Sequence, residues 1–356
     1  MTEIESVIYL ASCALNSTIP DKKCVSEMDL KKVYIIAQKH MIGACIAMAL
    51  ESAGYRDEVS ARIIGNAVSR AAYYDQAYEE VTKELNQAGI WNTPLKGIVL
   101  KDYYPEYGMR EMADHDILFD ETHADQVREI MEKIGFKSLS FGNGHNDAYL
   151  RAPGIEFEMH RTLYMPYHKK EFYDYYKDVK VFLKPEDFYL YLVTHEYKHY
   201  VWGGTGLRSL MDIYVYLKKE KLDWEYVEHE ARILGIKEFE YNNRVLAKKL
   251  FENESIENNE MLSYIVSSGV FGNYENTIKN EVLRNSGSKV RYAINRFLVP
   301  INPKNRRYEL YAKEFPVFYK YKILLPFLPL YRLYGSIKRG QLSNELKAIW
   351  KMNLKE

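Results

Sequence analysis

Short apolar runs of the kind that form β-strands occur together in only one part of this sequence, between residues 90 and 160. The runs are 90–93, 113–119, 136–141, 148–152 and 155–160, with helical patterns at 96–104 and 121–134. Outside this part, apolar residues recur at three- and four-residue spacing, which is the period of amphipathic helices. The distribution argues against a repeating βαβ sheet and predicts an α+β fold, with a small sheet embedded in a mostly helical protein.

The length and the charge distribution predict several structural units. The chain has 356 residues, about twice the usual ~150-residue domain. We expect a helical region at 1–88, a core at 89–165, a second helical region at 166–285 that closes a cleft, and a basic, aromatic segment at 286–356. The formal charge is balanced overall, but residues 286–356 hold 15 Lys and Arg against 4 Asp and Glu, a net +11. The remaining residues therefore carry −11.

The cysteines and the N-terminus indicate a cytoplasmic protein. Cys13, Cys24 and Cys45 show no CxxC spacing and have no histidine cluster around them, so neither a disulfide framework nor a zinc knuckle is indicated. Glu3 and Glu5 stand where a signal peptide has Lys or Arg. No stretch reaches the ~18 to 20 apolar residues that span a bilayer. We therefore expect no secretion and no stable membrane insertion.

The most informative motif is the pair Asp114 and Asp116 around His115, at the start of an apolar run. On a strand, the two carboxylates project from the same face, about 6.6 Å apart along the backbone. A divalent cation removes the repulsion between such groups, and Mg²⁺ is commonly held by one or two carboxylates together with phosphate oxygens of a substrate. An aspartate pair at a solvated strand edge is the alternative interpretation of this motif.

The residues around this pair favour a site for nucleotide phosphates. Lys96 and Gly97 open a helix after the first strand, so that backbone N–H groups, the positive helix end and an ammonium group face a triphosphate. Arg110 offers a second phosphate contact. On the strand 155–160, Glu158 and His160 share the polar face, so a third carboxylate is available.

The ordered set of these residues resembles the nucleotidyltransferase family long labelled uncharacterised, a branch of the DNA polymerase beta-like superfamily. The resemblance covers about residues 75–335 and reaches, more loosely, the aromatic segment 315–334. Its motifs are Leu95-Lys96-Gly97, Tyr104-Pro105, Arg110, Asp114-x-Asp116-Ile117-Leu118, Glu158-Met159-His160, then His195, Lys198 and His199, and Leu207-Arg208 followed by Asp212-Ile213.

The resemblance implies a mixed-sheet nucleotidyltransferase core and assigns roles to these residues. The catalytic metal ligands would be Asp114, Asp116 and Glu158. The residues that hold the nucleotide would be Lys96, Gly97, Arg110, His160, His195, Lys198 and His199. His115 stands where the family has an aliphatic residue, so we expect a hydrogen-bonded histidine in the core, behind the strand. Arg208 and Asp212 are expected to form an i,i+4 ion pair.

The same resemblance implies the reaction. A metal-dependent enzyme with Mg²⁺ (or Mn²⁺) would move a nucleoside monophosphate group, by default AMP from ATP, to a hydroxyl or phosphate acceptor and release pyrophosphate. The nucleoside triphosphate is the expected partner. The acceptor stays open among a small molecule, a sugar, a peptide, a protein side chain and an RNA end.

Two other functions compete with this interpretation. His195-Glu196-Tyr197-Lys198-His199 satisfies the HExxH pattern of zinc metallopeptidases, but Lys198 places a cation beside the supposed zinc, and no third ligand follows at metzincin spacing. The other alternative is a non-catalytic relative of the fold that binds RNA or another partner.

The basic segment 286–356 also has more than one interpretation. It fits RNA or another anionic partner, contact with a membrane surface through 315–334, or neutralisation of the acidic remainder of the chain, and we favour neutralisation. If RNA is the partner, its contacts are expected at Arg306, Arg307, Lys338 and Arg339.

Overall fold

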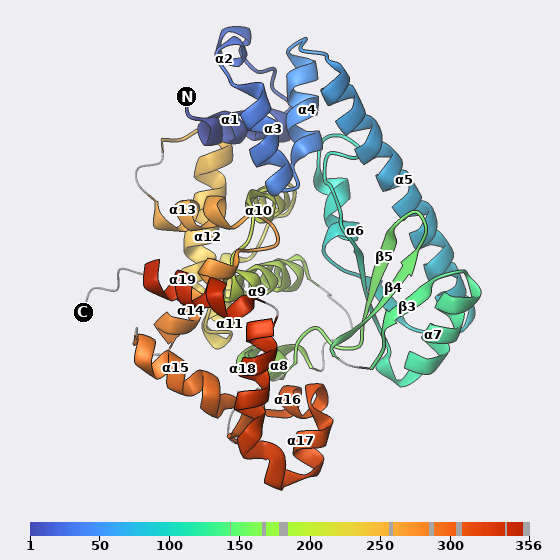
Figure 1. Ribbon diagram of the computed structural model, residues 1–356. Helices are drawn as coiled ribbons and strands as arrows, with labels where there is room; N and C mark the ends of the chain where they lie inside the picture. The colour runs from blue at the N-terminus through green and yellow to red at the C-terminus, as the bar shows by residue number, and fades with distance from the viewer. Residues whose placement is uncertain are drawn as a thin grey trace.

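The computed structural model describes residues 1–142, 144–165, 169–177, 184–255, 259–284, 288–303, 308–338 and 340–351. It has an α+β fold in which a five-stranded mixed sheet is embedded among helices, so the predicted fold class is confirmed (Figure 1). The five helices before the sheet are α1 (Glu3–Leu15), α2 (Lys22–Ser26), α3 (Leu30–Lys39), α4 (Gly43–Ser52) and α5 (Glu58–Gln87).

The sheet and its connections lie between residues 92 and 160. The strands are β1 (Asn92–Pro94), β2 (His115–Phe119), β3 (Lys137–Ser140), β4 (Asn146–Arg151) and β5 (Ile155–His160). The connecting helices are α6 (Gly97–Leu100), the 3-10 turns η1 (Lys101–Tyr103) and η2 (Glu121–His123), and α7 (Ala124–Lys133).

Helices make up the described residues after the sheet. The first group is α8 (Lys170–Tyr176), α9 (Pro185–Trp202), α10 (Leu207–Lys219), α11 (Trp224–Ile233) and α12 (Lys237–Phe251). The second group is α13 (Glu260–Ser268), α14 (Tyr274–Arg284), α15 (Lys289–Leu298), η3 (Val299–Ile301), α16 (Tyr308–Glu314), α17 (Pro316–Lys320), η4 (Lys322–Phe327), α18 (Leu328–Lys338) and α19 (Gln341–Lys351). None of the described helices combines the length and the apolar character needed to cross a bilayer.

Local sequence signals explain where the long helices begin and end. The carboxylate of Asp57 accepts a hydrogen bond from the Ser60 N–H, and the Ser60 hydroxyl accepts one from the Asp57 N–H, which caps α5. After α5 the chain turns at Gly89, whose φ of +69° favours glycine. α9 begins with Pro185, where a missing N–H costs nothing.

The strand order β1-β2-β5-β4-β3 places the last strand in the middle of the sheet. β2 and β5 are parallel, and the other neighbours are antiparallel. In the register of the parallel pair, Asp116 lies opposite Glu158, and Leu118 lies opposite His160. The polar faces of the two central strands are therefore side by side.

Helices α5 and α7 cover the apolar face of the sheet, as Figure 1 shows at the right of the molecule. Tyr74 of α5 and Met131 of α7 pack there against Ile117, Phe157 and Met159. Side chains alternate along a strand. The residues of β2 and β5 that lie between these core residues therefore face the helices on the opposite side of the sheet from α5 and α7.

A second and larger hydrophobic core joins helices that come before and after the sheet in the sequence. Leu10 of α1 belongs to the same core as Leu190 of α9 and Leu250 of α12. The Ser12 hydroxyl donates to the Phe251 carbonyl at 2.8 Å, which holds α1 against the end of α12. A small third cluster, with Ile278 and Val282, lies among the C-terminal helices.

Candidate active site

Two acidic side chains and a histidine come together on the polar face of β2 and β5. His160 Nε2 donates a hydrogen bond to Asp116 Oδ1 at 2.7 Å and lies 3.5 Å from Glu158 Oε2. The ligating atoms of the three residues lie within 4.8 Å of one another, and they form the one such cluster found among the described residues. Asp116 and His160 are buried, whereas the Glu158 side chain is 29% exposed. The alternation predicted for strand 155–160 is thus confirmed, since Glu158 and His160 share one face.

Lys96 completes this cluster from the turn after β1. Its Nζ donates to Asp116 Oδ1 at 2.7 Å, so that one carboxylate oxygen accepts from both Lys96 and His160. Burial alone would raise the pKa of Asp116, but the Lys96 charge and the hydrogen bond from His160 lower it below its usual value. Burial would lower the pKa of His160, yet its hydrogen bonds to Asp116 and Glu158 raise it overall. Asp116 is therefore held as a carboxylate.

The backbone at Lys96 is strained in a way that serves this contact. The Ile98 N–H donates to the Leu95 carbonyl at 3.3 Å, and Lys96 has φ 42° and ψ −112°. This is close to the first central position of a type II′ turn, which glycine normally occupies. The Leu95 N–H donates to the Asp116 carbonyl at 2.9 Å and ties the turn to β2. A lysine is thus kept in a costly conformation directly beside Asp116.

Asp114 lies one residue before β2 and is not part of the three-residue cluster. Burial raises the pKa of Asp114 to about 6, and the negative charges of Asp116 and Glu158 act in the same direction, whereas Lys96 and Arg208 oppose the rise. The three carboxylates are thus close enough to disfavour one another's charge. Lys96 alone does not neutralise them.

Gly97 and Arg110 are packed against each other rather than open towards a ligand. A Cβ at Gly97 would lie 2.5 Å from Arg110 Nη1, so glycine is needed for the guanidinium to lie over the turn. Arg110 Nε and Nη2 donate to the two oxygens of Asp212, both at 2.8 Å, and the Tyr104 hydroxyl donates to the same carboxylate at 2.7 Å. Arg110 is buried, and this pair fixes the loop before Asp114 to α10.

The predicted i,i+4 ion pair between Arg208 and Asp212 is wrong. Arg208 Nη1 donates to the Glu111 carbonyl at 2.9 Å, and Asp212 is occupied by Arg110. The reason is the path of the loop around residues 104–111. This loop lies against α10 and brings Arg110 to the carboxylate of Asp212. The sequence signal was present, because Tyr104 and Arg110 belong to the quoted motifs, but nothing in the sequence joins them to Asp212.

Helix α9 contributes one more charged residue to the site. Burial lowers the pKa of Lys198 to about 8, and the charge of Lys96 acts in the same direction, whereas Asp116 and Glu158 oppose it. Burial, followed by the charge of Lys96, also lowers the pKa of His195. Lys198 therefore lies within the electrostatic field of the carboxylates, and His195 lies within that of Lys96 and His160, on the helical side of the site.

The histidines of the HExxH sequence meet, but their glutamate does not join them. The Nε2 atoms of His195 and His199 are 3.1 Å apart, and His199 is exposed. Glu196 is buried, accepts a hydrogen bond from Asn243 Nδ2 at 2.5 Å and has its pKa raised to about 8 by burial. No third ligand converges on the two imidazoles among the described residues. This arrangement does not place a general base beside a zinc ion, which argues against a peptidase.

His115 occupies the core, as predicted, but the expected hydrogen bond is not found among the described residues. It lies on the apolar side of β2 against Tyr74, at 4.5 Å between ring centroids, and against Phe157. Neither ring nitrogen has a hydrogen-bond partner in the part of the chain that the structure describes, and burial lowers the pKa of His115 to about 3. The ring therefore acts as a neutral aromatic side chain behind the site.

The donor set of the site suits a hard divalent cation. Asp116 Oδ1 is taken by two hydrogen bonds, whereas none of the described side chains binds Oδ2. With Glu158 and Asp114, this leaves carboxylate oxygens as the available ligands, which Mg²⁺ and Mn²⁺ prefer. His160 uses its Nε2 proton on Asp116 and orients that carboxylate, as outer hydrogen-bond partners of metal ligands do.

A comparison with protein families agrees with this geometry. The family model described as "Uncharacterised nucleotidyltransferase" matches residues 26–252, which include all the site residues described above. The match begins before the region of resemblance expected from the motifs and ends before the aromatic segment 315–334. No curated protein and no solved structure matches the chain. Because the family match spans more than half of the sequence, the chain belongs to this uncharacterised nucleotidyltransferase family.

Proposed function

We propose that the protein is a metal-dependent nucleotidyltransferase with a polymerase beta-like core, and that it moves a nucleoside monophosphate group, by default AMP from ATP, to a hydroxyl or phosphate acceptor with release of pyrophosphate. The observation that carries this proposal is the contact network of Asp116, which Lys96 and His160 hold as a carboxylate beside Glu158. Family membership supports the reaction class.

Asp114, Asp116 and Glu158 would hold Mg²⁺ or Mn²⁺. Such an ion would neutralise the carboxylates and the triphosphate and stabilise the charge that develops during transfer. Its binding would account for three carboxylates that otherwise repel, a repulsion that the raised pKa of Asp114 reflects. The protein would hold the carboxylate oxygens in position for the ion. For Asp116 this is done by the hydrogen bond from His160.

The cations around the carboxylates would bind the nucleotide phosphates. Lys96 contacts Asp116 from the turn after β1, and Lys198 of helix α9 interacts electrostatically with Asp116 and Glu158. His195 and His199 would line the same side as Lys198. Glu158, the most exposed carboxylate of the cluster, would accept the proton of the acceptor hydroxyl. Catalysis would consist of positioning and charge stabilisation.

Two of the predicted phosphate contacts would have a narrower role. Because Arg110 Nε and Nη2 each donate to Asp212, Arg110 would mainly fix the loop before Asp114, and the N–H groups left for a phosphate are the two on Nη1 and one on Nη2. Gly97 would contribute its backbone N–H and the space that Arg110 fills. The predicted contacts of Gly97 and Arg110 with the nucleotide phosphates are thus kept in the proposal in this reduced form.

The test is transfer of label from each of the four α-labelled nucleoside triphosphates, with Mg²⁺ or Mn²⁺ and a lysate as the source of acceptor. We expect wild-type protein to label one class of acceptor with at least one triphosphate, and Asp116→Asn to lose the activity while it stays folded. Asp125→Asn is the matched control, because Asp125 is an exposed aspartate on α7, which covers the opposite face of the sheet.

Two outcomes would overturn the proposal. One is metal-dependent nucleotide binding without transfer to any acceptor, which would identify a non-catalytic relative of the fold. The other is transfer that Asp116→Asn does not impair, which would place the chemistry elsewhere.

A further inference from the structure

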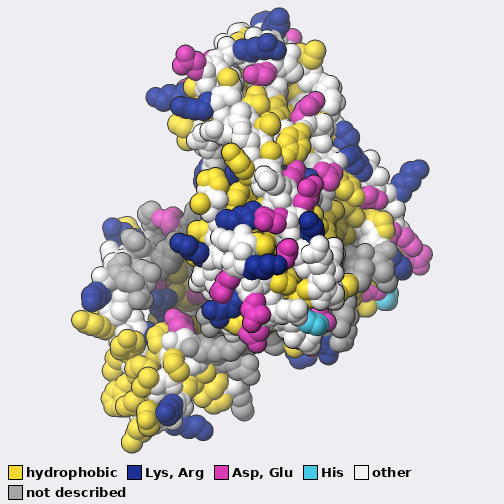
Figure 2. Space-filling view, turned by 90° about the vertical axis from the view of Figure 1, so that its right-hand side faces the viewer, with side chains coloured by type: hydrophobic (Ala, Val, Ile, Leu, Met, Phe, Trp, Pro, Cys, Tyr) yellow, Lys and Arg dark blue, Asp and Glu magenta, His cyan; other side chains and the backbone are white. Residues whose placement is uncertain are grey.

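The C-terminal helices α16, α17 and α18, with the turn η4, carry an unusually apolar surface that the nucleotidyltransferase site does not explain. Ile323 is 83% exposed, and large side chains that are more than half exposed surround it in the sequence: Val317, Tyr321, Phe327, Leu330, Tyr331, Tyr334 and Ile337. We call these eight residues the apolar tip. Figure 2 shows hydrophobic side chains gathered on the lobe at the lower left of the molecule.

Prolines explain why the tip residues before α18 are left outside. Pro316 begins α17, Pro326 lies inside η4, and Pro329 follows it, so the chain between them forms only short pieces. Short pieces cannot turn a continuous apolar stripe inward as a long amphipathic helix does. Leu328, which is fully buried, anchors the segment, and most of η4 stays exposed.

Positive charge predominates around the apolar tip, although Glu314 of α16 lies beside Tyr331 and Tyr334. Lys320, Lys322, Arg332 and Lys338 lie in or beside it, and the sequence has no Asp or Glu between Glu314 and Glu345. None of these four cations pairs with a carboxylate of the described residues; Arg332 Nη2 donates instead to the Tyr311 hydroxyl at 3.3 Å. The expected neutralisation by the acidic remainder of the chain is therefore not met at these four residues. Arg306, Arg307 and Arg339 lie outside the described residues.

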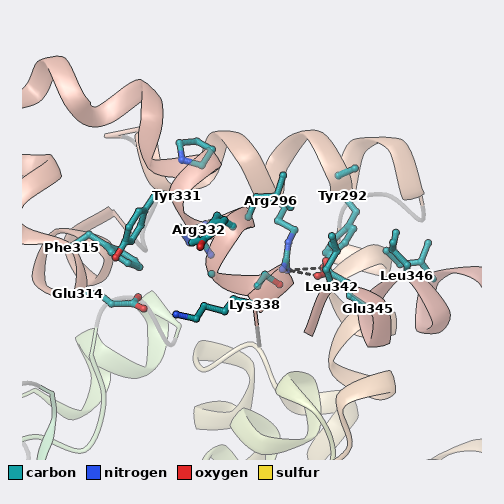
Figure 3. A pocket seen from close by; sticks show the side chains of 17 residues that line it. Tyr292, Arg296, Glu314, Phe315, Tyr331, Arg332, Lys338, Leu342, Glu345 and Leu346 are labelled. Carbon is teal, nitrogen blue, oxygen red and sulfur yellow. Dashed lines mark hydrogen bonds and ion pairs between the residues drawn. The ribbon is translucent and has the colours of Figure 1, made fainter. Parts of the chain in front are cut away.

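The apolar tip continues into a pocket with a polar wall. Tyr331 and Tyr334 also line a cavity of about 550 Å³ between α15, α18 and α19 (Figure 3). Arg332 and Lys338 line the same cavity, together with Ser336, whose buried hydroxyl has no hydrogen-bond partner among the described residues. The cavity thus combines an apolar lining with Arg332, Lys338, Glu314 and an unused hydroxyl, while its other two charged residues, Arg296 and Glu345, pair with each other at 2.6 Å.

We propose that this lobe docks on the surface of an anionic lipid bilayer. The aliphatic and aromatic side chains of the apolar tip would enter the boundary between headgroups and acyl chains, where tyrosine is favoured. Lys320 and Lys322 would keep their ammonium groups at the level of the lipid phosphates. The pocket beside the tip would receive one headgroup phosphate, with Arg332, Lys338 and the Ser336 hydroxyl as its partners.

Charge and chemistry favour a bilayer over two other occupants. A second copy of this face would bring the same four cations against each other, with no carboxylate between Glu314 and Glu345 to separate them. RNA would use the cations and some tyrosines, but exposed aliphatic side chains such as Ile323 and Leu330 offer nothing to a phosphate or to a base edge. An anionic bilayer uses both parts of the surface at once.

The test is flotation of the full-length protein with vesicles of phosphatidylcholine alone and of phosphatidylcholine mixed with phosphatidylglycerol. We expect binding to the mixed vesicles, and a loss of about 10-fold or more for Ile323→Asp and for Phe327→Asp, because each removes a large apolar side chain from the bilayer. Changing both Lys320 and Lys322 to Gln should weaken binding by about 5-fold per charge. Ile19→Asp is the matched control, because Ile19 is 70% exposed in the loop between α1 and α2.

Three results would overturn the proposal. One is wild-type protein that does not float with the anionic vesicles at physiological salt. Another is a loss of vesicle binding in Ile19→Asp as large as the loss in Ile323→Asp. A shift from dimer to monomer in Ile323→Asp, without vesicle binding by wild type, would assign the surface to a second copy instead. Nucleotide transfer to a soluble acceptor is expected to be the same in Ile323→Asp and wild type, so this test is separate from that of the active site.

Discussion

Replacing Asp114 by Asn is expected to increase the free energy of unfolding of the metal-free protein while it abolishes nucleotidyl transfer. Burial and the charge of Asp116 raise the pKa of Asp114 from 3.8 to about 6, so its ionised form is less favourable in the folded protein than in the unfolded chain. Asn has the same shape as a protonated Asp and cannot ionise. The variant therefore removes an unfavourable charge together with a metal ligand.

The size of the gain follows from the pKa. A pKa difference of about 2 corresponds to about 3 kcal/mol, and because solvent screens a partly exposed side chain, we expect a gain of about 1–3 kcal/mol. Between the two pKa values the unfolded chain binds fewer protons at Asp114 than the folded protein does. Raising the pH through this range therefore favours unfolding of the wild type. The advantage of the variant is complete above about pH 6 and disappears as the pH falls towards about 4.

The assay is chemical denaturation in EDTA, above pH 6 and again near the lower limit of this range, followed by thermal melting with and without Mg²⁺. Mg²⁺ is expected to stabilise wild type and to have little effect on Asp114→Asn. Glu106→Gln is the control for the loss of one negative charge, because Glu106 is exposed. The reasoning is refuted if Asp114→Asn is less stable than wild type above pH 6, if its gain persists at the low pH, or if Glu106→Gln gains as much.

Three further predictions concern the surroundings of the site. Lys96→Gly and Lys96→Ala should both weaken triphosphate binding in calorimetry. The Gly variant should be more stable than the Ala variant by about 1 kcal/mol, because glycine accepts the positive φ at this position. Equal stability of the two variants would contradict the proposed strain. Asp212→Ala should lower the free energy of unfolding by about 3–5 kcal/mol in denaturant titrations, since it leaves Arg110 buried and unpaired; a loss as small as that of a surface pair would argue against this. Elemental analysis should find no stoichiometric zinc, and one zinc per chain that His199→Ala removes would restore the peptidase interpretation.

Local patterns in the sequence were sufficient to predict the fold class and the strands. The change from helical spacing to short extended runs located the sheet, and strand 155–160 was predicted with the bounds that β5 has. Pairing was not predictable in the same way. The contact between β2 and β5 joins residues about 40 positions apart. It depends on how β3 and β4, which lie between them in the sequence, fold back so that β5 lies between β2 and β4 in the sheet.

The same distinction applies to the candidate site. Alternation along β5 predicted that Glu158 and His160 share a face, and the motif order predicted that Lys96 lies near the aspartates. The partners of Arg110 and Glu196 were missed, because Asp212 and Asn243 are brought to them by tertiary packing. Helical spacing placed His195 and His199 together, but spacing alone does not tell what the residue between them contacts.

The contact between α1 and the end of α12 has a consequence for synthesis of the chain on the ribosome. The Ser12 hydroxyl and the Phe251 carbonyl that it binds are 239 positions apart. At about 5–20 residues per second, the ribosome adds Phe251 about 10–50 s after Ser12. During that interval the side of α1 that packs against α12 is uncovered, while α3 and α4 cover other parts of the helix. The nascent chain is therefore expected to need a chaperone on its first helix, and synthesis that stops before α12 should give an aggregating product even when the whole sheet is already present.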